Sequence, residues 1–235
     1  MKNLNLFLLP GLLNDARLWQ RSMSDVSDMG HCSVADLTGA DSMSALASAA
    51  LSQAPGKQFA LAGFSMGGYV ALEIMRQAPE RVLGLALLDT SARPDTPQVT
   101  EGRRNLMRLA ATNLPAVIDA LLPRVLHPSH LDDKSILEVI KSMATTVGKE
   151  AFLRQQEAII GREDSRPFLH RVSCPTLVLC GREDLITPVE VHEEMAAAIP
   201  NSNLAVVEES GHMSLLEQPQ RVTEALRKWL LSLAP

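Results

Sequence analysis

The sequence contains no apolar run that approaches the ~18 residues of a membrane span, and it has no cluster of basic residues. Because the formal net charge is −5, we expect neither a membrane partner nor a nucleic-acid partner. The opening stretch, MKNLNLFLLPG, is too short and is interrupted too early for a signal peptide. These features favour an ordinary globular chain located in the cytoplasm.

Cysteine is also scarce. Cys32, Cys174 and Cys180 show neither C-x-x-C nor metal-ligand spacing, and they lie in or beside apolar stretches. We interpret all three as reduced core residues, which is typical of cytoplasmic proteins. We therefore expect no metal site, and we also expect no cofactor.

What the chain does contain is an alternation of apolar strand patterns with helical patterns. Its 235 residues, 46% of them hydrophobic, are enough for one domain with a sizeable core. The expected strands are 4–9, 32–37, 58–62, 82–89, 175–180 and 204–208, and the main expected helices are 16–23, 41–53, 69–75 and 219–231. This alternation predicts an α/β fold, with a mostly parallel sheet of about six strands between helices. In such a sheet, the ligand site lies at the carboxyl ends of the strands.

One segment, residues 93–170, interrupts the alternation. Its apolar residues fall at helical spacing, which predicts roughly four helices inserted between the fourth and fifth strands. We therefore expect a core domain of residues 1–92 and 171–235 and a helical lid of residues 93–170. The lid has 11 Lys or Arg against 10 Asp or Glu, so it is nearly neutral. Apolar lid residues such as Leu122 and Met143 are expected to line an acyl pocket.

The most informative motif is Gly63-Phe64-Ser65-Met66-Gly67, which fits the G-x-S-x-G pattern of a nucleophile elbow. An apolar strand pattern precedes the motif and a helical pattern follows it, which is the context that the elbow requires. A Gly-rich strand-to-helix turn without chemistry is the alternative interpretation. In the elbow, Ser65 stands exposed at a sharp bend between strand and helix.

With these patterns in view, the whole chain resembles the α/β-hydrolase family, whose nucleophile, acid and base follow in the order Ser, Asp or Glu, His. The corresponding residues here are Ser65, Asp184 and His212. Asp184 lies in GREDLITP, which resembles the family's G-x-x-D-x-x-T-P loop, and His212 follows Gly211 in a Gly-His loop. The resemblance implies that His212 is the base that activates the Ser65 hydroxyl, and that Asp184 orients the imidazole.

The resemblance also implies an oxyanion hole of two backbone amides, one after the nucleophile and one after the first strand. We assign these amides to Met66 and Leu12, with Leu13 as the alternative to Leu12. The chain departs from the family here, because Pro10-Gly11 stands where His-Gly is usual. Since proline has no amide hydrogen, the donor must come from a residue after Pro10.

Several other residues are candidates for roles in the site. Asp89, at the end of the fourth expected strand, is an alternative for the acid. Thr187 is expected to cap the next helix, with Pro188 at its first position. Arg162 or Arg166 either binds a substrate carboxylate or forms an ion pair between lid and core. The remaining histidines are expected in loops or on helix surfaces, without a catalytic role: His31, His127, His130, His170 and His192. Of these, His127 and His130, in the lid, are candidates for contact with the substrate.

Taken together, these patterns predict a serine hydrolase, of carboxylesterase type, that acts on a small ester, lactone or thioester as a monomer or homodimer. Carbon–carbon hydrolases, lyases and perhydrolases of the same family keep the same three residues, so they remain alternatives. A hydrolase-like ligand receptor is an alternative from a different class. Such a receptor would cleave a model ester at most once, whereas an enzyme would turn over.

Overall fold

The computed structural model describes residues 4–233, so residues 1–3 and 234–235 of the expected core lie outside the described part. One sheet has the strand order β2-β1-β3-β4-β5-β6, and every pairing in it is parallel. Its strands are β1 (Leu4–Leu9), β2 (Gly30–Val34), β3 (Phe59–Phe64), β4 (Val82–Leu88), β5 (Thr176–Gly181) and β6 (Ser202–Val207). The expected parallel α/β sheet is therefore confirmed.

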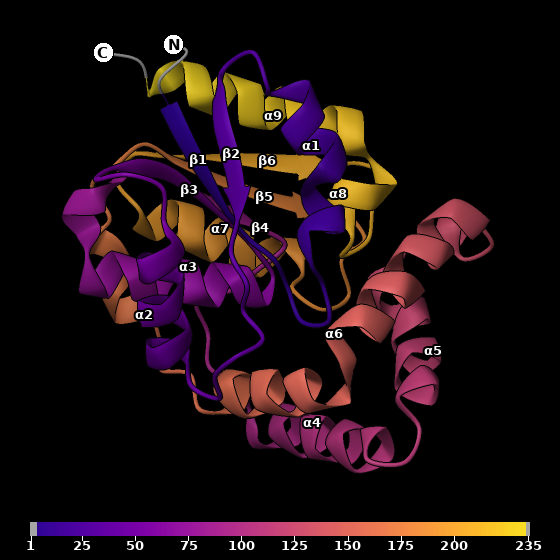
Figure 1. The fold of residues 1–235 in the computed structure, drawn as a ribbon. Coiled ribbons are helices and arrows are strands. Elements are labelled where there is room, and N and C mark those ends of the chain that lie inside the picture. Colours follow the sequence, from indigo (N-terminus) through magenta and orange to yellow (C-terminus); the bar gives the residue numbers. More distant parts are fainter. Residues whose placement is uncertain (1–3, 234–235) are drawn as a thin grey trace.

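Helices cover both faces of the sheet (Figure 1). On one face, α1 (Gln20–Asp25) packs against α9 (Pro219–Ser232), with the short α8 (Ser214–Glu217) beside them. The other face carries α2 (Met43–Gln53), α3 (Met66–Gln77) and α7 (Val189–Ala198). Short 3-10 turns complete the connections: η1 (Ala16–Trp19), η2 (Pro79–Arg81), η3 (Pro128–His130) and η4 (Arg166–Arg171).

The strands are apolar on both faces because each face has its own core. In β1, Leu6 and Leu8 belong to the core under α1 and α9, whereas Phe7 and Leu9 belong to the core under α2 and α3. Successive side chains of a strand point to opposite faces, so a strand covered on both faces needs apolar residues at every position. This explains the continuous apolar runs in the sequence.

The helical insertion follows β4 and returns to the sheet at β5, as expected. It contains α4 (Pro97–Ala110), α5 (Leu114–Val125) and α6 (Lys134–Ile160), and it extends from one end of the sheet (Figure 1). Helix α6 is interrupted at Gly148, where φ is 77° and ψ is 172°, so it consists of two helical halves. Helix α4 and both halves of α6 then account for three of the four expected helices, and α5 for the fourth. The division into a core domain and a lid stays a prediction.

Polar contacts that the sequence does not predict join the insertion to loops at the edge of the sheet. The Gln155 side chain accepts a hydrogen bond from the Leu13 amide (3.1 Å) and donates one to the Leu37 carbonyl (3.2 Å). The Arg154 guanidinium donates to the Thr38 carbonyl (2.8 Å). These contacts hold α6 against the loops that follow β1 and β2.

The topology places two loops in a favourable position for a ligand site. After β1 and β2, the chain crosses back over β1 to form β3, and all later strands are added on that side. The carboxyl ends of β1 and β3 therefore flank the point where the strand order reverses, which is where open α/β sheets bind ligands. Within residues 4–233, no helix is long and apolar enough to cross a membrane.

Candidate active site

The sharp bend at Ser65 joins β3 directly to α3. Ser65 has φ of 51° and ψ of −115° at the N-terminus of α3. A non-glycine residue in such a conformation costs about 1–3 kcal/mol, so the surroundings must hold it. The Ser65 amide donates to the Leu88 carbonyl (2.9 Å), and the Thr90 hydroxyl donates to the Ser65 carbonyl (2.8 Å). Neighbouring β4 and the loop after it therefore stabilise the bend.

Glycine is required beside this bend because α3 approaches β1 closely. A Cβ atom on Gly67 would lie 2.2 Å from the Leu9 carbonyl oxygen, which is far inside contact distance. Any larger residue would push the helix away from the strand and displace the loop after β1. The spacing of the motif therefore reflects the contact between helix and strand as well as the bend at Ser65.

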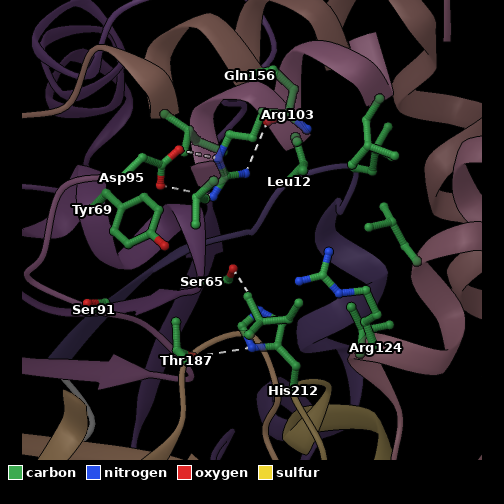
Figure 2. A pocket seen from close by; sticks show the side chains of 18 of the residues that line it. Leu12, Ser65, Tyr69, Ser91, Asp95, Arg103, Arg124, Gln156, Thr187 and His212 are labelled. Carbon is green, nitrogen blue, oxygen red and sulfur yellow. Dashed lines mark hydrogen bonds and ion pairs between the residues drawn. The ribbon is translucent and has the colours of Figure 1, made fainter. Parts of the chain in front are cut away.

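The structure brings Ser65, Asp184 and His212 together at the carboxyl ends of β3, β5 and β6. His212 Nε2 lies 2.9 Å from Ser65 Oγ (Figure 2). On the other side of the ring, His212 Nδ1 lies 2.7 Å from Asp184 Oδ2. Both distances are within hydrogen-bond range. Hydrogen bonds thus connect the serine hydroxyl to the imidazole and the imidazole to the carboxylate.

Asp184 is held by the loop that carries it. Its Oδ1 accepts hydrogen bonds from the amides of Ile186 (2.8 Å) and Thr187 (2.9 Å), and its Oδ2 accepts one from the Thr187 hydroxyl (2.7 Å). Burial opposes ionisation, but the charge and hydrogen bond of His212, with these donors, hold the pKa of Asp184 below its ordinary value. The carboxylate is therefore ionised and fixed in orientation.

The expected cap of α7 is wrong. The N-cap residue is Pro188, and no side chain caps the helix, because the Thr187 hydroxyl points to Asp184 instead. Thr187 Oγ1 also lies 3.4 Å from His212 Nδ1 (Figure 2). Its place beside both the acid and the imidazole could not be inferred from the capping pattern.

The His212 side chain is also buried. Burial alone would lower the pKa of His212, but the charge and hydrogen bond of Asp184 outweigh it, and the pKa lies above the ordinary 6.5. The loops that carry the two residues are adjacent: a Cβ on Gly181 would lie 2.0 Å from the Gly211 carbonyl oxygen. Glycine at the end of β5 thus permits the close approach of the His212 loop.

The loop after β1 brings the Leu12 backbone to the same cavity. The neighbouring amide of Leu13 donates to Gln155 (3.1 Å), so it is engaged elsewhere. Within residues 4–233 no acceptor is recorded for the Leu12 amide. Met66 occupies the first position of α3, where a helix leaves amides without intrahelical acceptors and its dipole favours negative charge. Of the two candidates after β1, Leu12 therefore fits an oxyanion donor better than Leu13.

Asp89, the alternative acid, lies elsewhere in the network. Its Oδ1 accepts from the Gly181 amide (2.9 Å), and its Oδ2 is hydrogen-bonded to the Ser214 hydroxyl. Burial and the nearby charge of Asp184 raise the pKa of Asp89 well above its ordinary value. Asp89 therefore connects β5 to the start of α8, whereas the carboxylate hydrogen-bonded to the His212 ring is that of Asp184.

Among the other histidines, His192 departs from expectation because it is completely buried. Its Nε2 accepts from the Thr90 amide (2.9 Å), its Nδ1 lies 3.2 Å from the Pro188 carbonyl, and burial lowers its pKa to about 4. His130 Nδ1 lies 2.9 Å from the buried Glu217 carboxylate, which also accepts from the His127 amide (2.7 Å). Neither His127 nor His130 lines the cavity beside Ser65.

The two arginines weighed as substrate ligands are paired within the insertion. Arg162 Nη1 lies 2.7 Å from Asp95 Oδ1, and its guanidinium stacks over the Tyr69 ring at 4.3 Å. Arg166 Nη2 lies 2.6 Å from Asp164 Oδ2. The closest partner of each arginine therefore belongs to the insertion. Within residues 4–233, the expected ion pair between lid and core is found for Arg166 alone of the two, whose Nη1 lies 3.8 Å from Glu194 Oε1 on α7.

Ser65 and His212 open onto a cavity of about 690 Å³ between the sheet edge and the insertion. Side chains from all three helices of the insertion line it, Leu122 among them, and Figure 2 shows part of this lining. Met143 does not reach the cavity; it is fully buried in the core, so its expected role is wrong. The described residues contain no group of three or more His, Cys, Asp or Glu placed to hold a metal ion.

Comparison with solved structures gives a close match. An esterase from Thermogutta terrifontis, solved with malate bound, is 31% identical, with a TM-score of 0.90. The match covers 100% of this chain and 92% of that one.

Two relatives known from sequence have different substrates. The pimeloyl-[acyl-carrier protein] methyl ester esterase of Nitrosomonas europaea is 26% identical, over 92% of each chain. The 3-oxoadipate enol-lactonase 2 of Acinetobacter baylyi is 29% identical over 72% of this chain and 62% of its own length. The model of the alpha/beta hydrolase fold family matches residues 6–219. On the sheet, the insertion and this match, the chain belongs to the alpha/beta hydrolase fold family.

Proposed function

We propose that this chain is a serine hydrolase that cleaves a small carboxylic ester, lactone or thioester through an acyl-enzyme on Ser65. The observation that carries the proposal is that Ser65 is hydrogen-bonded to His212 and His212 to Asp184, with Ser65 and His212 lining a cavity. A serine hydroxyl is a weak nucleophile at neutral pH, and an imidazole within 3 Å is the base that it needs. Family membership supports hydrolase chemistry in general, and the geometry supports the roles of the three residues.

In the first half of the reaction, Ser65 Oγ attacks the carbonyl carbon while its proton passes to His212 Nε2. The carbonyl oxygen becomes an oxyanion, which the amides of Leu12 and Met66 stabilise by hydrogen bonds. The tetrahedral species then collapses. The bond to the leaving group breaks, and the leaving oxygen or sulfur takes the proton from His212.

In the second half, water attacks the acyl-enzyme carbonyl and gives its proton to His212. Ser65 leaves as the alcohol and recovers that proton, and the carboxylic acid is released. Asp184 keeps Nδ1 of the ring protonated throughout, so that Nε2 faces Ser65 with a free lone pair. No cofactor is needed for these steps.

The relatives support small carboxylic esters and lactones as substrates. Malate, bound in the Thermogutta terrifontis esterase, is a carboxylic acid, the class of product that ester hydrolysis releases. The largely apolar cavity walls suit the hydrocarbon part of an acyl group. A proton-transfer set of the same kind also serves carbon–carbon hydrolases, lyases and perhydrolases, so the substrate must be found by assay.

A panel of p-nitrophenyl esters, lactones and acyl-CoA thioesters tests the proposal. The wild-type protein should turn over repeatedly on at least one class. Ser65→Ala should lower kcat by at least about 1,000-fold with the fold intact by circular dichroism, because the chemistry loses its nucleophile. A single turnover per molecule would instead indicate a ligand receptor, and full activity in Ser65→Ala would refute the mechanism.

A further inference from the structure

The cavity beside Ser65 is lined by an excess of positive charge. Its described lining includes four arginines, Arg93, Arg103, Arg124 and Arg162, but Asp95 is the one carboxylate among them. The near-neutral composition of the insertion does not predict this excess of positive charge, because most of its acidic residues lie outside the cavity lining. Arg93 and Arg124 are exposed to solvent, whereas Arg103 and Arg162 are partly buried. A cleft lined by charges of one sign attracts ligands of the opposite sign.

Three of these arginines already have carboxylate partners. Asp95 is shared by Arg103 (Nε to Oδ2, 2.6 Å) and Arg162 (Nη1 to Oδ1, 2.7 Å). Arg93 Nε lies 2.8 Å from Glu194 Oε2. Arg124 differs: within residues 4–233, neither an ion pair nor a hydrogen bond is recorded for its guanidinium.

The backbone beside Arg124 is fixed next to the reacting groups. Arg124 lies in the last turn of α5, and the carbonyl of the following residue, Val125, accepts from the Met213 amide (3.1 Å). Met213 directly follows His212, so the end of α5 is attached to the loop that carries the imidazole. A cation at this end of a helix is favoured by the dipole, but that effect does not require it to point into a cavity.

Figure 2 shows how the Arg124 side chain lies. Its guanidinium extends across the cavity in the direction of Ser65, and it is separate from the Arg103, Asp95 and Gln156 network on the opposite wall. Leu121 and Leu122, which precede Arg124 on the same helix, are apolar and also line the cavity. An arginine in this position presents a planar fork of donors that matches a carboxylate.

We propose that the cavity selects substrates that carry a free carboxylate besides the scissile bond, and that Arg124 binds this carboxylate. This inference rests on the proposed hydrolase function and names its substrate class, such as the half ester of a dicarboxylic acid. The carboxylate is held by the guanidinium while the apolar walls cover the chain between it and the scissile carbonyl, which lies at Ser65. A neutral ester of the same length lacks this contact.

Matched pairs of esters test the proposal. Monomethyl glutarate against methyl pentanoate places the charge on the acyl part, and 4-acetoxybenzoate against its methyl ester places it on the leaving group. For each pair we define the preference as the ratio of kcat/KM for the charged ester to that for the neutral one. Arg124→Gln should lower the preference of at least one pair by about 10- to 100-fold, mainly through KM.

Two further variants make the comparison specific. Arg124→Lys keeps the charge but not the fork, so it should lose less than Arg124→Gln. Arg104→Gln removes an exposed arginine of α4 that does not line the cavity, and its preference should equal that of the wild type. A preference in Arg124→Gln within twofold of wild type for both pairs would contradict the proposal, as would an equal loss in Arg104→Gln.

A binding measurement separates this inference from the proposed function. Calorimetric titration of glutarate into Ser65→Ala requires no turnover, and adding Arg124→Gln should weaken binding by about 10- to 100-fold. Glutarate binding that depends on Arg124, in a protein that hydrolyses no ester, would support the carboxylate site and refute the hydrolase. Hydrolysis of neutral esters with no effect of Arg124→Gln on preference or on glutarate binding would refute the carboxylate site alone.

Discussion

Asp184 and Asp89 are both buried carboxylates at the carboxyl ends of adjacent strands, and they differ in their partners. Asp184 is 2.7 Å from His212 Nδ1, whereas Asp89 is bonded to the Gly181 amide and the Ser214 hydroxyl. An Asn in place of the orienting carboxylate favours the wrong imidazole tautomer, which lowers kcat about 10,000-fold in serine proteases. Asp184→Asn should therefore lose activity on that scale with little change in KM.

Asp89→Asn is the matched control for Asp184→Asn. The raised pKa of Asp89 favours its neutral form, and an amide keeps that shape, accepts from Gly181 and donates to Ser214. Its kcat should stay within about tenfold of wild type. Steady-state kinetics on both folded variants decides the matter: a crippled Asp89→Asn beside an active Asp184→Asn would transfer the orienting role to Asp89.

The raised pKa of His212 predicts the pH dependence of turnover. His212 must be neutral to accept the Ser65 proton, so kcat/KM should fall as the pH decreases through the pKa of the free protein. Because Asp184 raises that pKa, the midpoint should lie above 6.5. In Asp184→Asn, burial acts without this opposition, and NMR titration of the His212 ring should give a lower pKa than in wild type. A midpoint below 6.5 in wild type would contradict the account.

At the level of elements, α5 and α4 supply apolar walls of the cavity. Leu122, on α5, is partly buried and lines the cavity. Leu122→Ala should shift the preference among acyl chain lengths more than it changes kcat on acetate esters, because a long acyl chain contacts more of an apolar wall than an acetyl group does. A methylene in an apolar pocket contributes about 1–3 kcal/mol to specificity, so the shift should be graded with chain length.

Leu109→Ala serves as the control for Leu122→Ala, since Leu109 is an exposed residue of α4 outside the cavity lining. Its chain-length profile, measured on p-nitrophenyl acetate to decanoate, should match wild type. Identical profiles for both variants would mean that α5 does not form an acyl wall.

These elements also show how far the sequence could be interpreted. β1 and α9 were predictable almost to the residue because continuous apolar strands and a strong helical pattern leave few alternatives. The interruption of α6 at Gly148 was not, because the apolar spacing continues across it. The direction of each lid side chain depends on how the helices pack. The sequence therefore could not show that Leu122 lines the cavity and Met143 does not, or that Arg124 lies apart from the other arginines.

For the candidate site, the grouping of Ser65, Asp184 and His212 was predictable because each follows a strand in a parallel sheet, at the same edge. Their catalytic roles stay predictions. Thr187 was expected to cap α7, and its contact with Asp184 was not predicted, nor were the contacts of Gln155. A polar residue that supports another through tertiary contacts has no local pattern. His192 was expected on a surface, but it is buried and accepts from the Thr90 amide in the loop after β4, a tertiary contact that the local pattern of α7 does not indicate.

For the whole molecule, His192 predicts a dependence of stability on pH. Burial lowers its pKa to about 4 in the folded state, against the ordinary 6.5 of an unfolded chain. The unfolded state therefore binds more protons between these values, so stability should fall as the pH drops through this window. The contribution of His192 to the loss between pH 7 and pH 5 should be about 2 kcal/mol.

Guanidinium unfolding at both pH values measures this loss. His192→Asn should lose less stability between pH 7 and pH 5 than wild type by about that amount, whatever its stability at pH 7. His31→Gln should behave as wild type, because His31 is exposed. A His192 ring that NMR shows protonated at pH 6 would contradict the account.

Covalent labelling can identify Ser65 as the nucleophile without knowledge of the natural substrate. A fluorophosphonate reacts with an activated serine and stays attached, so the modified peptide can be identified by mass spectrometry. We expect one adduct, on Ser65, that forms in wild type, is absent in Ser65→Ala and forms more slowly in Asp184→Asn. An adduct on another serine of the cavity, such as Ser91, or a folded wild-type protein that takes no label, would contradict this role of Ser65.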